Sequence, residues 1–439
     1  MKDRITLAIL LILLWIFLLI FQKYIPVPSS IYIVLGFMGF YALLIHVAQY
    51  HQKRKFKKHP PKLDTNYEPF VSILIPAHNE ESVIEDTVLN ILSLDYNKYE
   101  IIVIDDRSTD NTVLVLDKLS KKHPDRVKYY IRDKDAFPGK SAVLNEALEN
   151  TQGEVICVFD ADAKINPDFL KKILPCLSDP DTGAVQARKI ISNKDYNLLT
   201  RCQNNEYTLD GHFQLGRDAI KGAVELRGNG QLIKKEALID VGGWNNYTIT
   251  DDLDLSTKLH LKNWDIRFCT DAEVYEEGVI KPLPLAKQRR RWVEGSIRRY
   301  LDYFTQVIFS KEASFRVKLD MWAYISEFVL PIWLASEWFI QGIKVIRGVD
   351  HNILSSLTVM PAVFIFFFSG LIYSLRKYNK LSFWQALKQA LETVIYFVIM
   401  WPPIVMFIIF KIIFMKRTMD WGKTTHGLDL SDELTEEYN

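Results

Sequence analysis

The 439-residue chain lacks several features that would place it in a familiar soluble class. Its net charge is only +1, so no general electrostatic attraction favours nucleic acid, and we expect no nucleic-acid partner. Its four cysteines, Cys157, Cys176, Cys202 and Cys269, are scattered and form no C-x-x-C pair. They are therefore expected to be reduced core residues of a cytosolic domain, not a disulfide framework or a zinc site.

Three common ligand motifs are also missing from the sequence. It has no G-x-x-x-x-G-K-S/T loop, and no G-x-G-x-x-G follows the first expected strand, which excludes a P-loop and the usual dinucleotide-binding turn. The acidic stretch 251–254 lacks the glycine and the final glutamate of an EF-hand. Any phosphate or metal site must therefore be built in another way.

Long apolar runs are abundant and gather near the two ends of the chain. They cover residues 5–21, 31–47, 321–343, 353–375 and 393–410. A helix needs about 20 apolar residues, and at least about 17, to cross a bilayer. The runs predict an integral membrane protein with two spans in 1–50 and a C-terminal membrane region at 321–415. The basic linker 51–68 predicts that the polar middle of the chain is cytoplasmic.

The middle of the chain, residues 69–280, has the pattern of an α/β domain. Apolar strands are expected at 70–76, 99–106, 127–133 and 154–163, separated by stretches with helical spacing. Strands that alternate with helices of about a dozen residues favour βαβ units and a parallel sheet.

Three of these strands run into polar clusters. The clusters are His78-Asn79-Glu80, Asp105-Asp106, and Asp160 with Asp162. Ligands of open α/β sheets bind beyond the carboxyl ends of the strands, so the clusters are expected to converge on one crevice.

The triplet Asp160-Ala161-Asp162 is the strongest candidate for a metal site. On an extended strand end, alternation would place both carboxylates on one side, where they could approach Mg²⁺ or Mn²⁺ and a substrate phosphate. The alternative is a pair of solvated strand-end acids. Lys140, after Gly139 at an expected helix start, could bind a phosphate or could be an ordinary surface lysine.

Two further stretches carry polar residues that could take part in proton transfer or substrate binding. One carboxylate of 251–254 could be a general base, although early acids and a Thr250 N-cap also suit an ordinary helix start. In the basic segment 281–320, Gln288, Arg291 and Trp292 could offer a hydrogen-bonding amide, a diphosphate clamp and a stacking ring. The alternative is an interfacial helix at lipid head groups.

Taken together and in this order, "IPAHNE", "DDRSTD", "DAD", "TDD" and "QRRRW" resemble the membrane-embedded family 2 glycosyltransferases. The resemblance implies a GT-A fold, a nucleoside-diphosphate sugar donor, a divalent metal and an inverting mechanism. By position, the resemblance implies that the uridine is bound by Ala77, His78, Asn79, Glu80, Asp105 and Asp106. It implies donor contacts by Lys140 and Asp160, and metal binding by Asp162. It also implies a general base at Asp252 beside Asp251, and diphosphate or acceptor contacts by Gln288, Arg291 and Trp292. Asp251 stands where the family has glutamate.

A narrower likeness involves "ELRGNGQ" at 225–231 together with the "TDD" and "QRRRW" segments, which is similar to bacterial monoglucosyldiacylglycerol synthases of the cyanobacterial type. It implies an enzyme of the bacterial plasma membrane that moves glucose from a UDP-sugar to diacylglycerol with a β linkage. The alternatives are a processive polysaccharide synthase, a non-catalytic nucleotide-sugar scaffold and a metal-dependent phosphohydrolase. A polar tail at 416–439 completes the predicted organisation.

Overall fold

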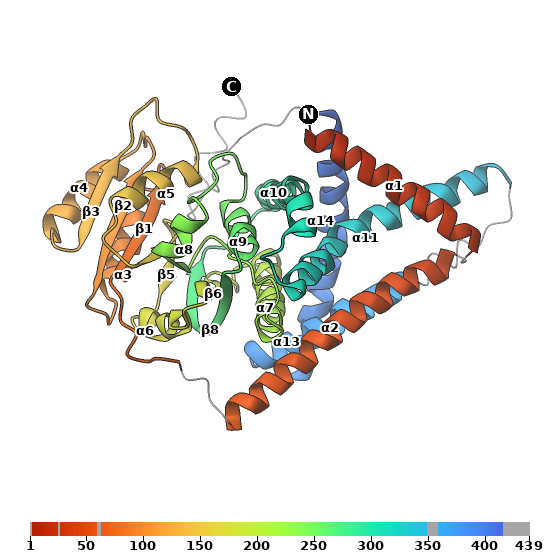
Figure 1. Cartoon of the computed structure of the whole chain (residues 1–439), viewed down its shortest axis with the longest axis horizontal. Helices are drawn as coiled ribbons and strands as arrows, with labels where there is room; N and C mark the ends of the chain where they lie inside the picture. Colours follow the sequence, from red (N-terminus) through yellow and green to blue (C-terminus); the bar gives the residue numbers. More distant parts are fainter. Residues whose placement is uncertain (1, 25–26, 59–62, 349–358, 416–439) are drawn as a thin grey trace. The chain divides into compact units, whose positions relative to one another are not determined.

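The computed structural model describes residues 2–24, 27–58, 63–348 and 359–415 (Figure 1). They form two compact units. An α/β unit is made of Lys62–Thr200 and Glu225–Pro284, and a helical unit of Met1–Pro61, Arg201–Val224 and Leu285–Met419. The predicted tail 416–439 and the first residues of the apolar run 353–375 lie outside the described residues.

The α/β unit is built on one sheet. Within the described residues its strands are β1 (Val71–Ala77), β2 (Tyr99–Asp105), β3 (Val127–Ile131), β4 (Val155–Val158), β5 (Lys164–Ile165), β6 (Thr182–Ile191), β7 (Gln231–Lys234) and β8 (Asp265–Glu276). Its helices are α3 (Ile84–Leu92), α4 (Thr112–Lys122), α5 (Lys140–Glu149), α6 (Phe169–Ile173), the 3₁₀ turn η1 (Leu174–Leu177), α8 (Lys235–Asp240) and α9 (Asp251–Leu261). The four strands expected from the sequence are confirmed as β1 to β4.

The strands are ordered β3-β2-β1-β4-β7-β6-β8-β5. The first four run parallel, as expected, but β7 is antiparallel to both β4 and β6, and β5 is antiparallel to β8. The prediction of a purely parallel sheet is therefore wrong, and the sheet is mixed. Strands β5 and β7 are two and four residues long, too short for an alternation pattern to reveal them.

Apolar burial explains the parallel half of the sheet. Every residue of β1 and β2 is buried, because helices cover both faces of a parallel sheet. Helix α5 packs on β1 and β2, and α4 packs on β3 (Figure 1). The register places Ala77 of β1 opposite Asp105 of β2, and Val158 of β4 opposite Leu74. The polar residues that follow these strands therefore leave the sheet at one edge.

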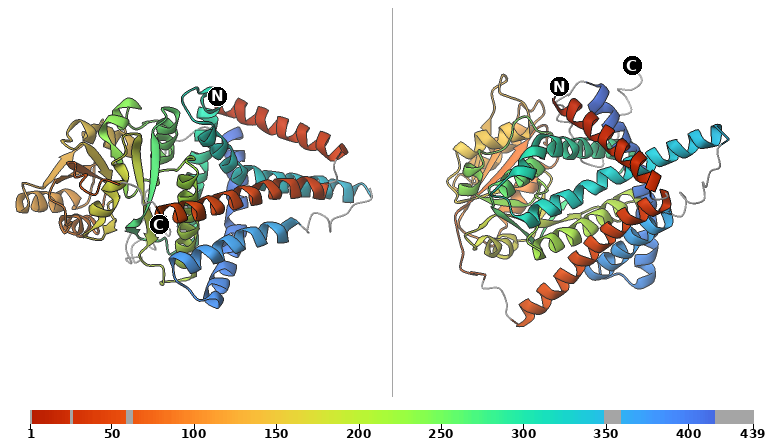
Figure 2. Two further views of the ribbon diagram at one scale, coloured as in Figure 1. Left: turned by 60° about the horizontal axis from the view of Figure 1, so that its bottom comes forward. Right: turned by 45° about the vertical axis from the view of Figure 1, so that its right-hand side comes forward.

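The helical unit packs long helices against one another (Figure 2). In the part of the chain that is described, they are α1 (Lys2–Tyr24), α2 (Val27–Lys58), most of α7 (Leu198–Ala219) and α10 (Pro282–Phe309), α11 (Phe315–Ile346), α13 (Val359–Tyr378) and α14 (Phe383–Phe414). Helix α14 packs against α1, α11 and α13. One apolar core joins residues of α1, α10, α11 and α14, and another joins α7, α13 and α14.

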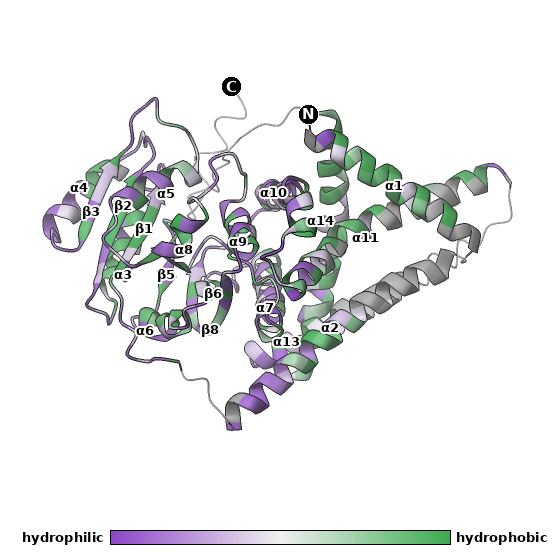
Figure 3. Cartoon of the chain, in the orientation of Figure 1, coloured by the Kyte–Doolittle hydropathy of each residue, from purple (hydrophilic) through white to green (hydrophobic). Residues whose placement is uncertain are grey.

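The five predicted spans all fall on helices where they are described, but they differ in length and polarity. Of the described helices, α14 is the one long and apolar enough to cross a membrane, and the N-terminal apolar stretch Arg4–Phe17 is shorter than that. The two N-terminal spans stay a prediction. Apolar colour runs along α14 in Figure 3. A capping box of Ser382 and Gln385 fixes where this helix begins.

Candidate active site

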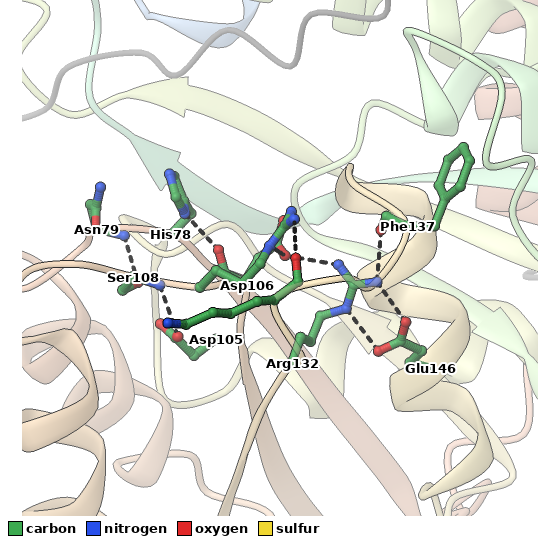
Figure 4. A network of polar contacts seen from close by, with 10 residues as sticks. His78, Asn79, Asp105, Asp106, Ser108, Arg132, Phe137 and Glu146 are labelled. Carbon is green, nitrogen blue, oxygen red and sulfur yellow. Dashed lines mark hydrogen bonds and ion pairs between the residues drawn. The ribbon is translucent and has the colours of Figure 1, made fainter.

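Two loops that follow β1 and β2 are joined by hydrogen bonds at the sheet edge (Figure 4). The Asn79 amide donates to Ser108 Oγ over 2.7 Å, and the Thr109 amide donates to Asn79 Oδ1 over 2.7 Å. Asn79 and Arg107 have φ angles of 54° and 64°, which residues other than glycine rarely adopt. Such backbone persists only where its surroundings fix it, and it gathers at ligand sites.

The two acids after β2 have different surroundings. Asp106 is 2% exposed, and its Oδ1 accepts hydrogen bonds of 2.8 Å from both Arg107 and Arg132. Asp105 is fully buried; its Oδ2 accepts from the Ser108 amide at 3.0 Å, while its Oδ1 is buried without a hydrogen-bond partner among the described residues. Asp106 is committed to two guanidinium groups, so Asp105 is the acid with a free acceptor for a ligand N–H.

Arg132 is a residue of this site that sequence reasoning missed. Its side chain is 1% exposed and bridges Asp106 to Glu146 of α5, with a 2.5 Å contact to Glu146 Oε1 (Figure 4). The hydrogen bonds that Arg132 donates to Glu146, together with the charge of Asp106, outweigh burial and raise the pKa of Arg132. Arg132 stands 26 residues from Asp106 in the chain, and the isolated arginine of "YIRD" matches no motif.

The Asp160-Ala161-Asp162 segment is a turn instead of an extended strand end. Strand β4 ends at Val158, and the Ala163 amide donates to the Asp160 carbonyl over 3.1 Å. The expectation that strand alternation aligns Asp160 with Asp162 is therefore wrong. Asp160 Oδ1 accepts a 2.6 Å bond from Lys140 Nζ, whereas Asp162 Oδ2 accepts from the Glu277 amide at 3.3 Å. The two carboxylates thus have separate partners.

The turn at Asp160–Asp162 and the strand that follows it are held from two sides by polar side chains. Thr87 Oγ1 of α3 donates to the Ala161 carbonyl over 2.6 Å, and the Asn90 side chain both donates to and accepts from the backbone of Ile165. On the other side, the Asp160 amide donates to Asn229 Oδ1 over 3.3 Å. Backbone carbonyls and amides that are fixed in this way set the directions of the two aspartates.

For the nucleoside-diphosphate sugar donor that the motif resemblance implies, replacing Thr87 by valine is expected to weaken binding by about tenfold, because the buried Ala161 carbonyl loses its donor while the side-chain shape is kept. Calorimetric titration with UDP measures the loss. Thr257→Val is the matched control, since the buried Thr257 hydroxyl bonds to Leu253 within its own helix. Equal losses of UDP affinity in the two variants would contradict a role for Thr87 in holding the turn.

Lys140, Asp252 and Gly228 lie close together. Gly228 has a φ of +78°, and a Cβ at that position would lie 3.4 Å from Asp252 Oδ2 and 3.7 Å from Lys140 Nζ. Lys140 begins α5 after Gly139, whose φ is +110° and whose Cβ direction is open. Glycine at both positions leaves space for a ligand to reach the lysine and the carboxylate.

Asp252 has the pKa of a base that works near neutrality. Burial and the adjacent Asp251 raise the pKa of Asp252 to about 6, against the opposing effects of the Leu253 amide, Lys140 and Arg227. Burial lowers the pKa of Lys140, but Asp160, Asp251 and Asp252 outweigh it and raise that pKa. Lys140 therefore stays cationic beside an acid that titrates close to physiological pH. Thr250 is the N-cap residue of α9, as expected, but its side chain makes no cap hydrogen bond.

Asp162 also borders a cavity of about 280 Å³, lined by Val83, Asp86, Thr87, Asp162, Lys164, Ser192, Asn193 and Glu277. No group of three or more histidine, cysteine or acidic side chains in the described residues could hold a metal ion alone. The hard carboxylate oxygens of this wall nevertheless suit Mg²⁺ or Mn²⁺, which bind through one or two carboxylates and complete their shell with water and phosphate oxygens. The donor set fits a metal that arrives with a diphosphate.

Gln288, Arg291 and Trp292 belong to helix α10, in the helical unit. All three are partly exposed, while their neighbour Arg289 is buried. The Arg289 guanidinium donates to Gln288 Oε1 over 2.9 Å and lies 4.0 Å from the centroid of the Trp292 ring. Sequence reasoning passed over Arg289.

Comparison with known proteins identifies the class. Residues 69–295 match the family described as Glycosyltransferase like family 2. The chain is 36% identical over 376 residues to the β-monoglucosyldiacylglycerol synthase of Synechocystis sp., covering 83% of this chain and 77% of that protein. It is 31% identical over 292 residues to the poly-β-1,6-N-acetyl-D-glucosamine synthase of Staphylococcus aureus, covering 65% and 67%.

Among solved structures, the mannosyltransferase PcManGT of Pyrobaculum calidifontis, in complex with GDP-Man and Mn²⁺, aligns over 85% of this chain and 98% of its own, with a TM-score of 0.59 and 20% identity. This likeness supports a GT-A-like fold. The protein is therefore a glycosyltransferase, and it belongs to glycosyltransferase family 2. Within that family it is closely related to the β-monoglucosyldiacylglycerol synthases, and the resemblance read from the motifs is confirmed.

Proposed function

We propose that the protein transfers glucose from UDP-glucose to diacylglycerol with inversion, giving a β-linked glycolipid. The observation that carries the chemistry is the placement of Asp252, with a pKa raised to about 6, beside the Lys140–Asp160 pair across Gly228. The identity to β-monoglucosyldiacylglycerol synthases supports the sugar and the acceptor. Transfer of radiolabel from UDP-glucose into extracted lipid tests the proposal.

Donor binding is assigned to the edge where β1, β2 and β4 end. Asp105 Oδ1, buried and without a partner in the described part of the chain, would accept the N–H of the uracil ring. Ala77, His78, Asn79, Glu80 and Asp106 would shape the uridine pocket around it. Lys140 would pair with the diphosphate or sugar, with Asp160 holding its ammonium group in place.

Asp162 would hold Mg²⁺ or Mn²⁺, and a cation bound there would neutralise charge on the departing diphosphate. The proposed proton transfer uses Asp252 alone: its carboxylate accepts the proton of the acceptor hydroxyl as that oxygen attacks the anomeric carbon. UDP leaves from the opposite face, so an α-linked donor gives a β product. Arg291 is proposed to contact the diphosphate, and Gln288 and Trp292 are proposed to contact the acceptor.

We further propose that α14 anchors the enzyme in the plasma membrane with the α/β unit in the cytoplasm. The length and apolarity of α14 support a span, and the basic residues at the end of α2 support a cytoplasmic side for residues 53–58. A lipid acceptor requires only that the enzyme reach the bilayer surface.

The second candidate function, a processive polysaccharide synthase, is favoured by the 31% identity to the poly-N-acetylglucosamine synthase.

The rate of transfer is expected to fall as the pH drops through about 6, by about tenfold per pH unit below that value. The pKa of Asp252 is raised above the usual 3.8, so the carboxyl takes up a proton on acidification through pH 6 and no longer accepts one from the acceptor. Asp251→Asn removes the neighbouring negative charge, so the acidic limb of the pH–rate profile, where the rate falls, is expected to move to lower pH. Profiles of kcat/KM measure both effects; a limb that stays near pH 6 in Asp251→Asn would contradict the assignment.

A further inference from the structure

Arg289 of α10 is a buried cation at the junction of three helices of the helical unit. It is 2% exposed, and its Nη2 donates to Glu206 Oε2 of α7 over 2.8 Å. The same Glu206 oxygen accepts a 3.1 Å hydrogen bond from the hydroxyl of Tyr396 in α14. Burying an arginine is costly unless a carboxylate pairs with it, so Glu206 fixes where Arg289 can lie.

The other contacts of Arg289 reach the two ends of the Gln288–Trp292 motif. Its Nη1 donates to Gln288 Oε1, and its guanidinium lies on the Trp292 ring. A guanidinium is a rigid plane, so one orientation of Arg289 sets both the Gln288 amide and the indole plane. Gln288 and Trp292 are partly exposed, so they can be reached by a ligand, whereas Arg289 lies beneath them.

We propose that Glu206 and Arg289 are positioning residues that orient Gln288 and Trp292 toward the acceptor. Glu206 holds the arginine, the arginine holds the amide oxygen of Gln288, and the amide N–H groups of Gln288 are thereby turned outward, where they can donate to an acceptor oxygen. This inference rests on the proposed function, since it assumes that Gln288 and Trp292 contact substrate.

The Arg289 guanidinium keeps its charge in the physiological range. Burial acts to lower the pKa of Arg289, but Glu206, Tyr396 and Tyr207 together outweigh it and the pKa is raised, so the guanidinium stays cationic. The pair is thus a fixed support, and its loss is expected to change substrate binding without changing the pH profile.

Helix α10 offers a matched control in Glu294. This carboxylate is 4% exposed and binds Arg298 at 2.8 Å and Lys411 of α14 at 2.7 Å. Glu206→Gln and Glu294→Gln both replace a carboxylate that is paired with a buried arginine by its isosteric amide, and both weaken a contact between helices. Glu206 supports the residue that holds Gln288 and Trp292, and Glu294 supports Arg298 instead.

The test measures KM for the acceptor, kcat, calorimetric affinity for UDP and thermal stability in the full-length enzyme. Glu206→Gln is expected to raise the acceptor KM by about tenfold, with UDP affinity and the pH profile near wild type, whereas Glu294→Gln keeps the wild-type acceptor KM. Arg289→Lys, which keeps the charge but loses the planar fork, is expected to behave like Glu206→Gln. An unchanged acceptor KM in Glu206→Gln, or an equal rise in Glu294→Gln, would overturn the proposal.

The assay is run with whichever acceptor the wild-type enzyme glycosylates. A wild type that glycosylates a glycan instead of diacylglycerol would contradict the proposed acceptor, while the comparison of Glu206→Gln with Glu294→Gln would still decide the positioning role. The two failures are therefore distinguishable.

Discussion

Asp252→Asn is expected to lower the rate of sugar transfer by about 10²–10⁴-fold, the usual contribution of a general base. Asparagine keeps the shape of the side chain, and its carbonyl oxygen can still accept the hydrogen bond from the Leu253 amide. The asparagine side chain, however, cannot take the proton of an acceptor hydroxyl. The donor site is assigned to other residues, so UDP-sugar affinity should stay close to that of the wild type. Steady-state rates and calorimetric titration with UDP measure the two quantities.

Asp254→Asn provides the control for the first experiment. Asp254 lies on the same helix, is 3% exposed and accepts a hydrogen bond from Asn245. Its loss is expected to affect stability more than turnover. Thermal unfolding should show Asp252→Asn at least as stable as the wild type, because ionised Asp252 is raised in free energy by burial and by Asp251. Near-normal turnover in Asp252→Asn would rule out this residue as the base.

Asp162→Ala is expected to remove most of the Mn²⁺-dependent part of UDP binding, with a loss of affinity on the order of 100-fold. A metal held by few protein carboxylates depends strongly on each of them. Calorimetric titration of UDP with and without Mn²⁺ separates the metal-dependent binding from the rest, independently of catalysis.

The control is Asp86→Asn, a change at another acid of the same cavity wall. It is expected to keep the response to Mn²⁺, because Asp86 belongs to helix α3 and lies outside the Asp160–Asp162 turn. If Asp162→Ala responded to Mn²⁺ as the wild type does, the metal would have to be held elsewhere.

The sequence predicted the elements whose burial pattern is strong. Strands β1 and β2 are mostly apolar and are buried along their whole length, so both their positions and the shared edge at which they end could be inferred. The antiparallel strands β5 and β7 could not, because they are two and four residues long and, unlike the four-residue β4, do not belong to a longer apolar run. This is why a parallel sheet was expected where a mixed one is found.

In the candidate site, too, local motifs could be found in the sequence, whereas contacts between residues far apart in the chain could not. The motifs located the acids, but not the geometry of the turn at Asp160 and Asp162, since a strand and a tight turn can share the letters "DADA". Arg132 and Glu206 were missed because each meets its partner far along the chain, Asp106 and Arg289 respectively. Such long-range pairs depend on the three-dimensional fold and have no signature in a single sequence.

The number of membrane spans stays a prediction from the apolar runs. All five expected spans are helical where described, yet α14 alone among the described helices has the length and apolarity of a span. Helices α1, α10, α11 and α14 share one apolar core, which shows that apolar residues of these helices serve packing between helices.

The identity of the product tests the central claim most directly. Purified enzyme is incubated with radiolabelled UDP-glucose, diacylglycerol and Mg²⁺ or Mn²⁺, and the mixture is extracted into organic solvent. We expect the label in a lipid-soluble glucosyl product with a β anomeric configuration, formed by the wild type and absent with Asp252→Asn. Label that remains in a water-soluble or insoluble polymer, or that is released as free sugar, would contradict glycolipid synthesis.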